Sequence, residues 1–209
     1  MKATASKPAF SVELRAAKIP GIVGLIADHY WFVVVKGARG CGASHQQRWE
    51  VWQHKNAGGQ SWHYLHKNLK TCQSGVGNGP SRVEYCWRGA KAARLIRVLE
   101  MSPKTYPYLA RYLYWPGPNS NTFVQWVLDQ AQINLTPGPS AIGKDYLGLL
   151  GIKQLNRGVM LSTPVLTLAF ARKKYLLVQL LMLPFGLFFK PFRIIYPGFR
   201  PGHKQAKKE

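Results

Sequence analysis

Alternating and uninterrupted apolar runs dominate the first part of the chain and predict an antiparallel sheet. Residues 10–14 alternate apolar and polar side chains, as a strand with one buried face does. Residues 30–35 form an uninterrupted β-branched and aromatic run, which predicts a buried strand. Residues 48–53 alternate again, so we expect them to pair with that strand as a hairpin across a loop at residues 36–44. Residues 62–69 are aromatic and histidine-rich and predict a third strand.

Two helices are predicted after these strands. Residues 90–100 contain strong helix formers, and we expect this helix to stop before Pro103, because proline removes a helical hydrogen-bond donor. Residues 119–131 place apolar side chains at helical spacing, with Asn119 or Ser120 as the N-cap. The pattern therefore predicts an α+β fold, in which the two helices pack on a small antiparallel sheet.

The chain changes character near residue 150, which predicts two parts: an α+β domain at 1–150 and a basic, apolar extension at 151–209. The apolar run at 175–189 is shorter than the about 20 residues that a helix needs to cross a bilayer. Cations flank it on both sides, so we expect a helix lying in the membrane interface. Residues 172–193 would then contact an anionic membrane surface or a membrane protein complex. The alternative is a segment packed on the protein's own core, with the cations as a solvated rim.

The charge composition is one-sided and narrows the choice of partner. The chain has 29 Lys and Arg against 8 Asp and Glu, a net charge of +21, which favours polyanions. Because the cations gather around an apolar run, we rank a membrane above nucleic acid. The scattered acids and three widely spaced cysteines predict neither a cofactor nor a metal site. The first ten residues lack a signal-peptide apolar segment, so we expect a cytoplasmic protein peripheral to the inner membrane.

Two short segments together suggest nucleophilic chemistry. His29 opens the strongest predicted strand, and Ser120 lies in the first turn of the second helix. A helix N-terminus stabilises negative charge on a nucleophile and on a developing oxyanion. A histidine on a rigid strand nearby acts as general base. The simpler interpretation is that Ser120 only caps its helix.

The order of these segments resembles the permuted papain-like superfamily, which includes lecithin:retinol acyltransferase-like enzymes. Members open the first core strand with a pattern like His-Trp-x-x-Tyr-Val, and residues 29–34 read His-Tyr-Trp-Phe-Val-Val. Their nucleophile follows in a pattern like Asn-Cys-x-x-Phe-Val, and residues 119–124 read Asn-Ser-Asn-Thr-Phe-Val. Ser120 thus stands where these enzymes have cysteine. The whole chain also resembles a bacterial domain-of-unknown-function family, number 3750.

The papain-like resemblance implies a third, polar residue on the second core strand. By position this residue is Glu50, with Gln53 or His54 as alternates. A carboxylate there holds the histidine ring in one tautomer and stabilises the imidazolium ion. The alternative is that Glu50 pairs with Arg48 or another cation. Because a serine hydroxyl does not ionise at neutral pH, activity would depend wholly on His29 as base.

Three functions follow, of which the third is the weakest. The first is a hydrolase or acyltransferase at a membrane surface that acts on an ester, thioester or amide through Ser120, His29 and Glu50. The second is an inactive papain-like scaffold, an accessory subunit that binds a membrane protein complex or anionic lipid. The third is a nucleic-acid-binding protein, which rests on net charge alone.

Overall fold

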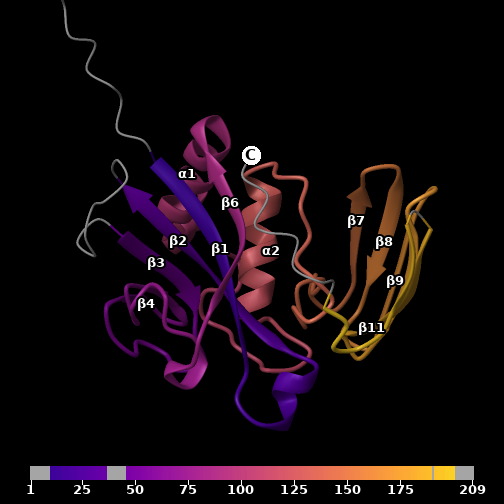
Figure 1. Cartoon of the computed structure of the whole chain (residues 1–209), viewed down its shortest axis with the longest axis horizontal. Helices are drawn as coiled ribbons and strands as arrows, with labels where there is room; N and C mark the ends of the chain where they lie inside the picture. Colours follow the sequence, from indigo (N-terminus) through magenta and orange to yellow (C-terminus); the bar gives the residue numbers. More distant parts are fainter. Residues whose placement is uncertain (1–9, 37–45, 190, 201–209) are drawn as a thin grey trace, which may run out of the picture.

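The computed structural model describes residues 10–36, 46–189 and 191–200 and has an α+β fold, as the sequence predicts. Two six-stranded antiparallel sheets and two α-helices make up the molecule (Figure 1). The two sheets lie at opposite ends of the molecule, with α2 between them and α1 on the face of the first sheet. The predicted loop at 36–44 falls almost entirely outside the described residues.

The first sheet contains the predicted strands and sets up the site. Its strand order is β4-β5-β3-β2-β1-β6. The predicted hairpin is confirmed, because β2 pairs with β3 in antiparallel register with Phe32 opposite Trp49. The predicted third strand is two short strands joined by a tight turn, in which His63 has φ 54°. The strands are β1 (Phe10–Lys18), β2 (Asp28–Lys36), β3 (Gln46–Val51), β4 (Gln60–Trp62), β5 (Leu65–Lys67) and β6 (Arg82–Arg88).

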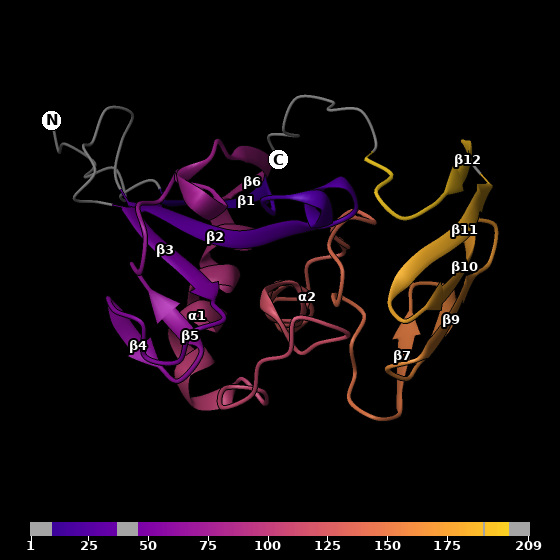
Figure 2. The same ribbon diagram turned by 90° about the horizontal axis from the view of Figure 1, so that it is seen from below.

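Both helices cover one face of this sheet. Helix α1 (Gly89–Thr105) packs on β1 and β6, and α2 (Ser120–Gln130) packs on β2 and β3 (Figure 2). The core between them is fully buried and includes Phe32, Leu95 and Phe123. Two short 3-10 helices, η1 (Ile22–Leu25) and η3 (Val76–Asn78), lie in the connections. The apolar faces predicted from spacing therefore meet in a single core.

Helix α1 continues past Pro103, so the predicted stop before this proline is wrong. Proline cannot donate to the carbonyl four residues earlier, which here belongs to Leu99. The Ser102 hydroxyl donates to that carbonyl instead, at 2.6 Å. The helix therefore continues to Thr105 without leaving this buried acceptor unsatisfied.

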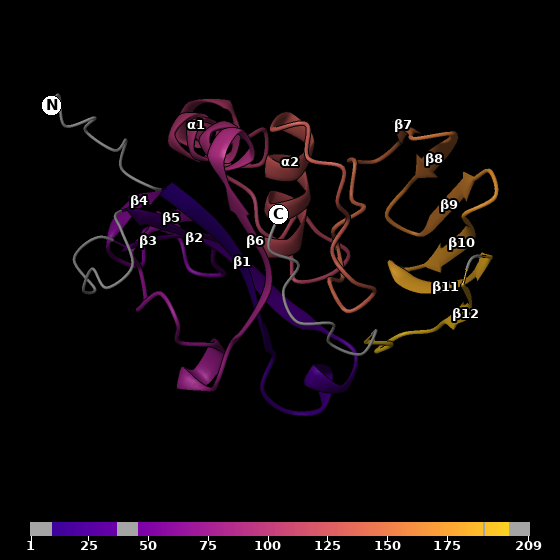
Figure 3. The ribbon, with the colours of Figure 1, turned by 45° about the horizontal axis from the view of Figure 1, so that its top comes forward.

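The second sheet follows the chain in simple order, β12-β11-β10-β9-β8-β7, as an antiparallel meander (Figure 3). It lies beside α2, at the opposite end of the molecule from β4. Its strands are β7 (Gly151–Leu155), β8 (Gly158–Ser162), β9 (Leu166–Ala171), β10 (Tyr175–Leu180), β11 (Leu183–Phe189) and β12 (Phe192–Ile195).

The interfacial helix predicted at residues 175–189 is wrong, because this segment forms the hairpin of β10 and β11. The turn consists of Leu181 and Met182, with φ of 50° and 62°. Such a two-residue turn normally carries Asn-Gly, so the sequence gives no sign of it. In the part of the chain that the structure describes, no helix is long and apolar enough to cross a membrane.

Polar and apolar contacts join the second sheet to the rest of the molecule. Ser162 Oγ donates to the Asp145 carbonyl at 2.8 Å, and Gln179 Nε2 donates to the Asp145 carboxylate. Met182 packs against Ile142 and Tyr146. A cavity of about 440 Å³ remains between the segment at 134–145 and the inner face of this sheet. The inner face is therefore the one that faces the segment at 134–145.

Candidate active site

Ser120 is the first residue of α2, and its side chain does not cap the helix. The cap is Asn119, whose Oδ1 accepts the amides of Asn121 and Thr122 at 3.0 and 3.2 Å. Thr122 Oγ1 returns a bond by accepting the Asn119 amide at 3.1 Å, which completes a capping box. The Ser120 hydroxyl is thus left for another partner.

That partner is His29 on β2. His29 Nδ1 lies 2.9 Å from Ser120 Oγ, although the two residues are 91 positions apart in the chain. Asn121 fixes the strand to the helix on both sides of His29. Its Nδ2 donates to the Asp28 carbonyl at 3.0 Å, and its Oδ1 accepts the Tyr30 amide at 3.2 Å. The approach of Ser120 to His29 therefore has a specific backbone support.

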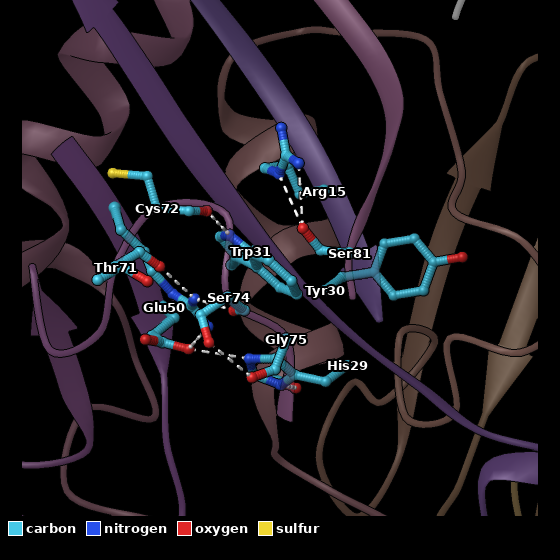
Figure 4. A network of polar contacts seen from close by, with 12 residues as sticks. Arg15, His29, Tyr30, Trp31, Glu50, Thr71, Cys72, Ser74, Gly75 and Ser81 are labelled. Carbon is cyan, nitrogen blue, oxygen red and sulfur yellow. Dashed lines mark hydrogen bonds and ion pairs between the residues drawn. The ribbon is translucent and has the colours of Figure 1, made fainter. Parts of the chain in front are cut away.

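The other ring nitrogen of His29 faces Glu50 on β3. His29 Nε2 lies 2.9 Å from Glu50 Oε2, as Figure 4 shows for the two labelled side chains. Glu50 is fully buried, and its second oxygen, Oε1, has no hydrogen-bond partner among the described residues. Because a carboxylate accepts from Nε2–H, the proton of the neutral ring is on Nε2. His29 Nδ1 is then free to accept the Ser120 proton.

Arg48 holds Glu50 from the other side. Arg48 Nη2 donates to Glu50 Oε2 at 2.7 Å, and both side chains are fully buried. Its Nη1 donates to the carbonyls of Thr71 and Ser74 at 2.9 and 2.5 Å. Its guanidinium lies 4.1 Å from the ring centre of Trp31. The predicted alternatives for Glu50 are therefore both realised, since the carboxylate pairs with His29 and with Arg48.

The electrostatics favour a neutral base beside an ionised carboxylate. Burial lowers the pKa of His29 below its ordinary value, and the neighbouring Glu50 offsets this only in part. Burial raises the pKa of Glu50, but the hydrogen bond and charge of His29, together with Arg48, hold it below its ordinary value. At neutral pH, His29 can accept a proton, and the negative charge of Glu50 stabilises the imidazolium ion that results.

Aromatic rings set the orientation of the His29 ring. The ring stacks on Trp31 with centroids 5.4 Å apart, and the edge of Trp52 approaches it at 5.3 Å. Trp31 is itself fixed by donating from Nε1 to the Cys72 carbonyl at 3.0 Å, which Figure 4 includes. The ring therefore has little freedom to turn away from its two polar partners.

The alternates for the third residue do not reach the site. Gln53 and His54 bond to each other at 2.8 Å on the surface, beyond the end of β3. Asp28, the acid next to His29 in sequence, is fully buried but faces other groups. Its carboxylate accepts from Ser140 at 2.7 Å, from Arg82 at 2.7 Å and from Arg200 at 3.0 Å. Of these positions, the structure brings only Glu50 to His29.

Sequence reasoning treated Arg48 only as a competitor for Glu50 and missed its part in the site. Arg48 and Glu50 are two residues apart on one strand, so their side chains lie on the same face. Two residues of opposite charge on one face of a predicted strand were the available signal. Asp28 and Asn121 carried no comparable signal, because their partners lie far away in the sequence.

The Ser120 amide bears on the chemistry of the site, and the burial of Ser120 and His29 limits access to it. The Ser120 amide is in the first turn of α2, where N–H groups have no intrahelical acceptor. Within the described residues it makes no hydrogen bond, so it can donate to an oxyanion formed beside Ser120 Oγ. Ser120 and His29 are each only 5% exposed. Both side chains are therefore almost closed off from solvent.

Comparison of the chain with known proteins identifies its family but no activity. Among the described residues, no three His, Cys, Asp or Glu side chains lie close enough to hold a metal ion. No curated protein and no solved structure matches the chain. A family model described as "Protein of unknown function (DUF3750)" matches residues 9–146, which contain the whole first sheet, both helices and the site. The chain belongs to this family, DUF3750.

Proposed function

We propose that this chain is a serine-dependent hydrolase or acyltransferase that acts on an ester, thioester or amide. The observation that carries the proposal is the continuous hydrogen-bonded path from Ser120 Oγ through both nitrogens of His29 to Glu50, with 2.9 Å at each contact. The three groups come from three different elements, α2, β2 and β3. Nucleophile, base and orienting carboxylate are the parts that acyl transfer by serine requires.

The reaction proceeds in two halves. Ser120 Oγ bonds to the substrate carbonyl carbon while its proton passes to His29 Nδ1. The oxyanion lies at the N-terminus of α2 near the Ser120 amide, and Glu50 stabilises the imidazolium. The carbonyl re-forms and the bond to the leaving group breaks, with the proton on His29 passing to that group. Water, or an acceptor alcohol, thiol or amine, then repeats these steps in reverse and frees Ser120.

The resemblance to permuted papain-like enzymes supports this assignment of roles. It rests on the histidine that opens β2, the Asn-Ser-x-x-Phe-Val sequence that opens α2, and the order in which they occur. The departure is Ser120, where those enzymes have a cysteine. A buried neutral histidine and an ionised glutamate supply the base that a hydroxyl needs and a thiolate does not.

The test is turnover of a panel of 4-nitrophenyl esters and acyl thioesters by the full chain and by Ser120→Ala. The proposal predicts measurable hydrolysis that falls at least about 10³-fold in Ser120→Ala. The matched control is Ser61→Ala. Ser61 Oγ also bonds a histidine, His66 Nδ1 at 2.8 Å, but His66 Nε2 faces a backbone carbonyl and no carboxylate. Ser61→Ala should leave turnover unchanged.

A second function, a catalytically inactive scaffold, is favoured by one observation. Ser120 and His29 are almost fully buried, and a hydroxyl replaces the thiol of the resembling enzymes. In that case the Ser120–His29–Glu50 path holds α2 against β2 and β3. Ser120→Ala would then change the free energy of unfolding by about 1 kcal/mol. The wild-type chain would show no turnover above the Ser120→Ala background.

A further inference from the structure

The outer face of the second sheet is apolar and open to solvent. Inward and outward side chains alternate along β7 to β11, and the inward ones are buried, such as Ala169 and Gln179, or half-buried. Within the described residues of these strands, Gln154 is the only polar side chain at an outward position. The outward apolar side chains that are at least 37% exposed are Ile152, Val159, Leu161, Leu166, Leu168, Phe170, Leu176, Val178, Leu180, Phe185, Leu187, Phe189, Phe192 and Ile194.

The strand register arranges these side chains in continuous rows. One row runs from Ile152 through Leu161, Leu168 and Val178 to Phe185, one residue from each strand from β7 to β11. The next row runs in the same direction one pleat further along the strands. Six strands at about 4.8 Å spacing make this face about 24 Å wide. We call it the outer apolar face.

Such a face is unusual for a sheet surrounded by water. An antiparallel sheet covered on one side normally carries polar residues on the other. Isolated exposed apolar side chains are common, but a continuous face marks a surface that binds something apolar. The outer apolar face is therefore a binding surface.

Cations lie together at one end of the same sheet. The turn between β7 and β8 carries Arg157, and the turn between β9 and β10 carries Arg172, Lys173 and Lys174, all exposed. The Arg172 amide donates to the Arg157 carbonyl at 2.9 Å, so the two turns are adjacent. Within the described part of the chain, none of these four side chains forms an ion pair with a carboxylate. They are free to bind anions.

We propose that the outer apolar face docks on an anionic lipid bilayer, with the cationic turns at its rim. Apolar side chains enter the boundary between headgroups and acyl chains. Long cationic side chains at the rim extend to lipid phosphates, as they do beside interfacial helices. The sequence predicted a membrane contact at residues 172–193 through a helix. In this proposal a sheet face that includes these residues makes the contact instead. This proposal does not depend on catalysis by Ser120.

The main competing occupant is a second copy of this chain, packed face to face. The net charge of +21 opposes that arrangement, because two copies would bring two strongly cationic molecules together. An anionic leaflet meets the same apolar face and neutralises the charge. Charge complementarity therefore selects the lipid surface.

The test is flotation of the full chain with vesicles of phosphatidylcholine alone or mixed 3:1 with phosphatidylglycerol. The wild-type chain should float with the mixed vesicles, and less so in 0.5 M salt. Leu168→Gln/Leu176→Gln changes no charge and should weaken binding about tenfold or more. Arg172→Gln/Lys173→Gln, in an exposed turn, should remove the preference for the anionic vesicles. Circular dichroism checks that each variant is folded.

Two controls separate this proposal from catalysis and from general stickiness. Ile22→Gln alters an 80% exposed apolar residue in η1, outside the face, and should bind as the wild type does. Ser120→Ala should also bind as the wild type does, whether or not it hydrolyses esters. Equal binding by the wild type and both double variants would overturn the proposal. So would a wild-type dimer in light scattering that ignores vesicles and dissociates in Leu168→Gln/Leu176→Gln.

Discussion

Glu50 Oε2 accepts two hydrogen bonds in the buried site, from His29 at 2.9 Å and from Arg48 at 2.7 Å. The hydrogen bond from His29, together with the Arg48 guanidinium, keeps the carboxylate ionised, and the ionised carboxylate fixes the tautomer of the imidazole. Arg48 thus acts on His29 through Glu50, and its own charge also lowers the pKa of the imidazole. A lone buried carboxylate at this position would have its pKa raised by burial and would lose the charge that the proposed reaction requires.

Replacing Glu50 by glutamine tests the orienting role. Glu50→Gln keeps the shape, but the amide has lost the charge that stabilises the imidazolium and can present N–H to the ring. We expect turnover to fall by about 10²–10⁴. Stopped-flow or steady-state ester hydrolysis measures the change. A less than threefold loss, with the fold intact, would remove Glu50 from the proposed machinery.

The pH dependence of turnover tests the state of His29. Burial lowers the pKa of His29 below its ordinary value of 6.5, and the base must be neutral to act. The midpoint of the decline in turnover with falling pH should therefore lie below pH 6.5. Glu50 raises the pKa of His29, so the decline in Glu50→Gln should move to lower pH still. A decline centred above pH 7 in the wild type would contradict this electrostatic account.

At the scale of elements, the side chain of Asn121 links the start of α2 to the start of β2 by hydrogen bonds. It bonds the backbone on both sides of His29 and also donates to the Ile142 carbonyl at 2.9 Å. The helix start and the strand start are thereby fixed to each other. The distance between Ser120 Oγ and His29 Nδ1 depends on these bonds, because Asn121 follows Ser120 and holds the backbone on both sides of His29.

Replacing Asn121 should shift Ser120 away from His29 while the Ser120 hydroxyl itself stays in the chain. In Asn121→Ala we expect turnover to fall about tenfold or more and the free energy of unfolding to fall by about 1–3 kcal/mol, because buried backbone groups lose partners. The pH at which turnover declines should not move, since the His29 environment keeps its charges. Gln125→Ala, one turn along the same helix and bonded only to Asp129, should lose much less turnover.

The elements of the first sheet could be predicted because their sequences have clear periodicity. The strand at β2, its hairpin partner β3 and the capped start of α2 all follow from local residue patterns. The approach of Ser120 to His29 was suggested only by the resemblance, since 91 residues separate them. Short-range patterns carry no information about which helix end meets which strand end.

The second sheet could not be predicted, for a physical reason that is itself informative. Both faces of β10 and β11 are rich in apolar residues, so the alternation that identifies a half-buried strand is absent. Its hairpin turn, Leu181 and Met182, uses residues that rarely adopt positive φ. The outward apolar side chains that remove the apolar–polar alternation from these strands are the ones that form the outer apolar face.

At the scale of the whole molecule, one carboxylate joins the end of the described chain to its beginning. Arg200 donates to both Asp28 oxygens, at 3.0 and 3.1 Å, and to the Gly24 carbonyl at 2.8 Å. Arg200 lies in the basic extension predicted at residues 151–209, outside the membrane contact expected at 172–193. The structure places it against the first sheet, and only part of that basic segment is left for an external partner.

This contact predicts loss of stability in acid. Burial raises the pKa of Asp28, but its bonds to Arg200, Ser140 and Arg82 hold the pKa below its ordinary value of 3.8. The unfolded chain therefore binds protons first as the pH falls, so the stabilisation is complete above about pH 5 and is lost below pH 4. Denaturant melts at pH 7 and pH 3 measure this loss.

Asp28→Asn should lower the free energy of unfolding by about 2 kcal/mol at pH 7 and weaken the acid dependence. The matched control is Glu84→Gln, which removes a more exposed carboxylate from the same Arg82 and should cost under about 1 kcal/mol. Similar losses for both variants would show that the contact between Asp28 and Arg200 contributes no special stability.

The central claim is that Ser120 is an activated nucleophile, and locating a covalent adduct tests it most directly. The full wild-type chain would be treated with a fluorophosphonate, digested and mapped by tandem mass spectrometry. The account predicts one adduct, on Ser120, which forms faster at pH 7.5 than at pH 5 because neutral His29 accepts the proton. An adduct on another serine, or none on a folded chain, would contradict it. The Ser120–His29–Glu50 path would then have only a structural role.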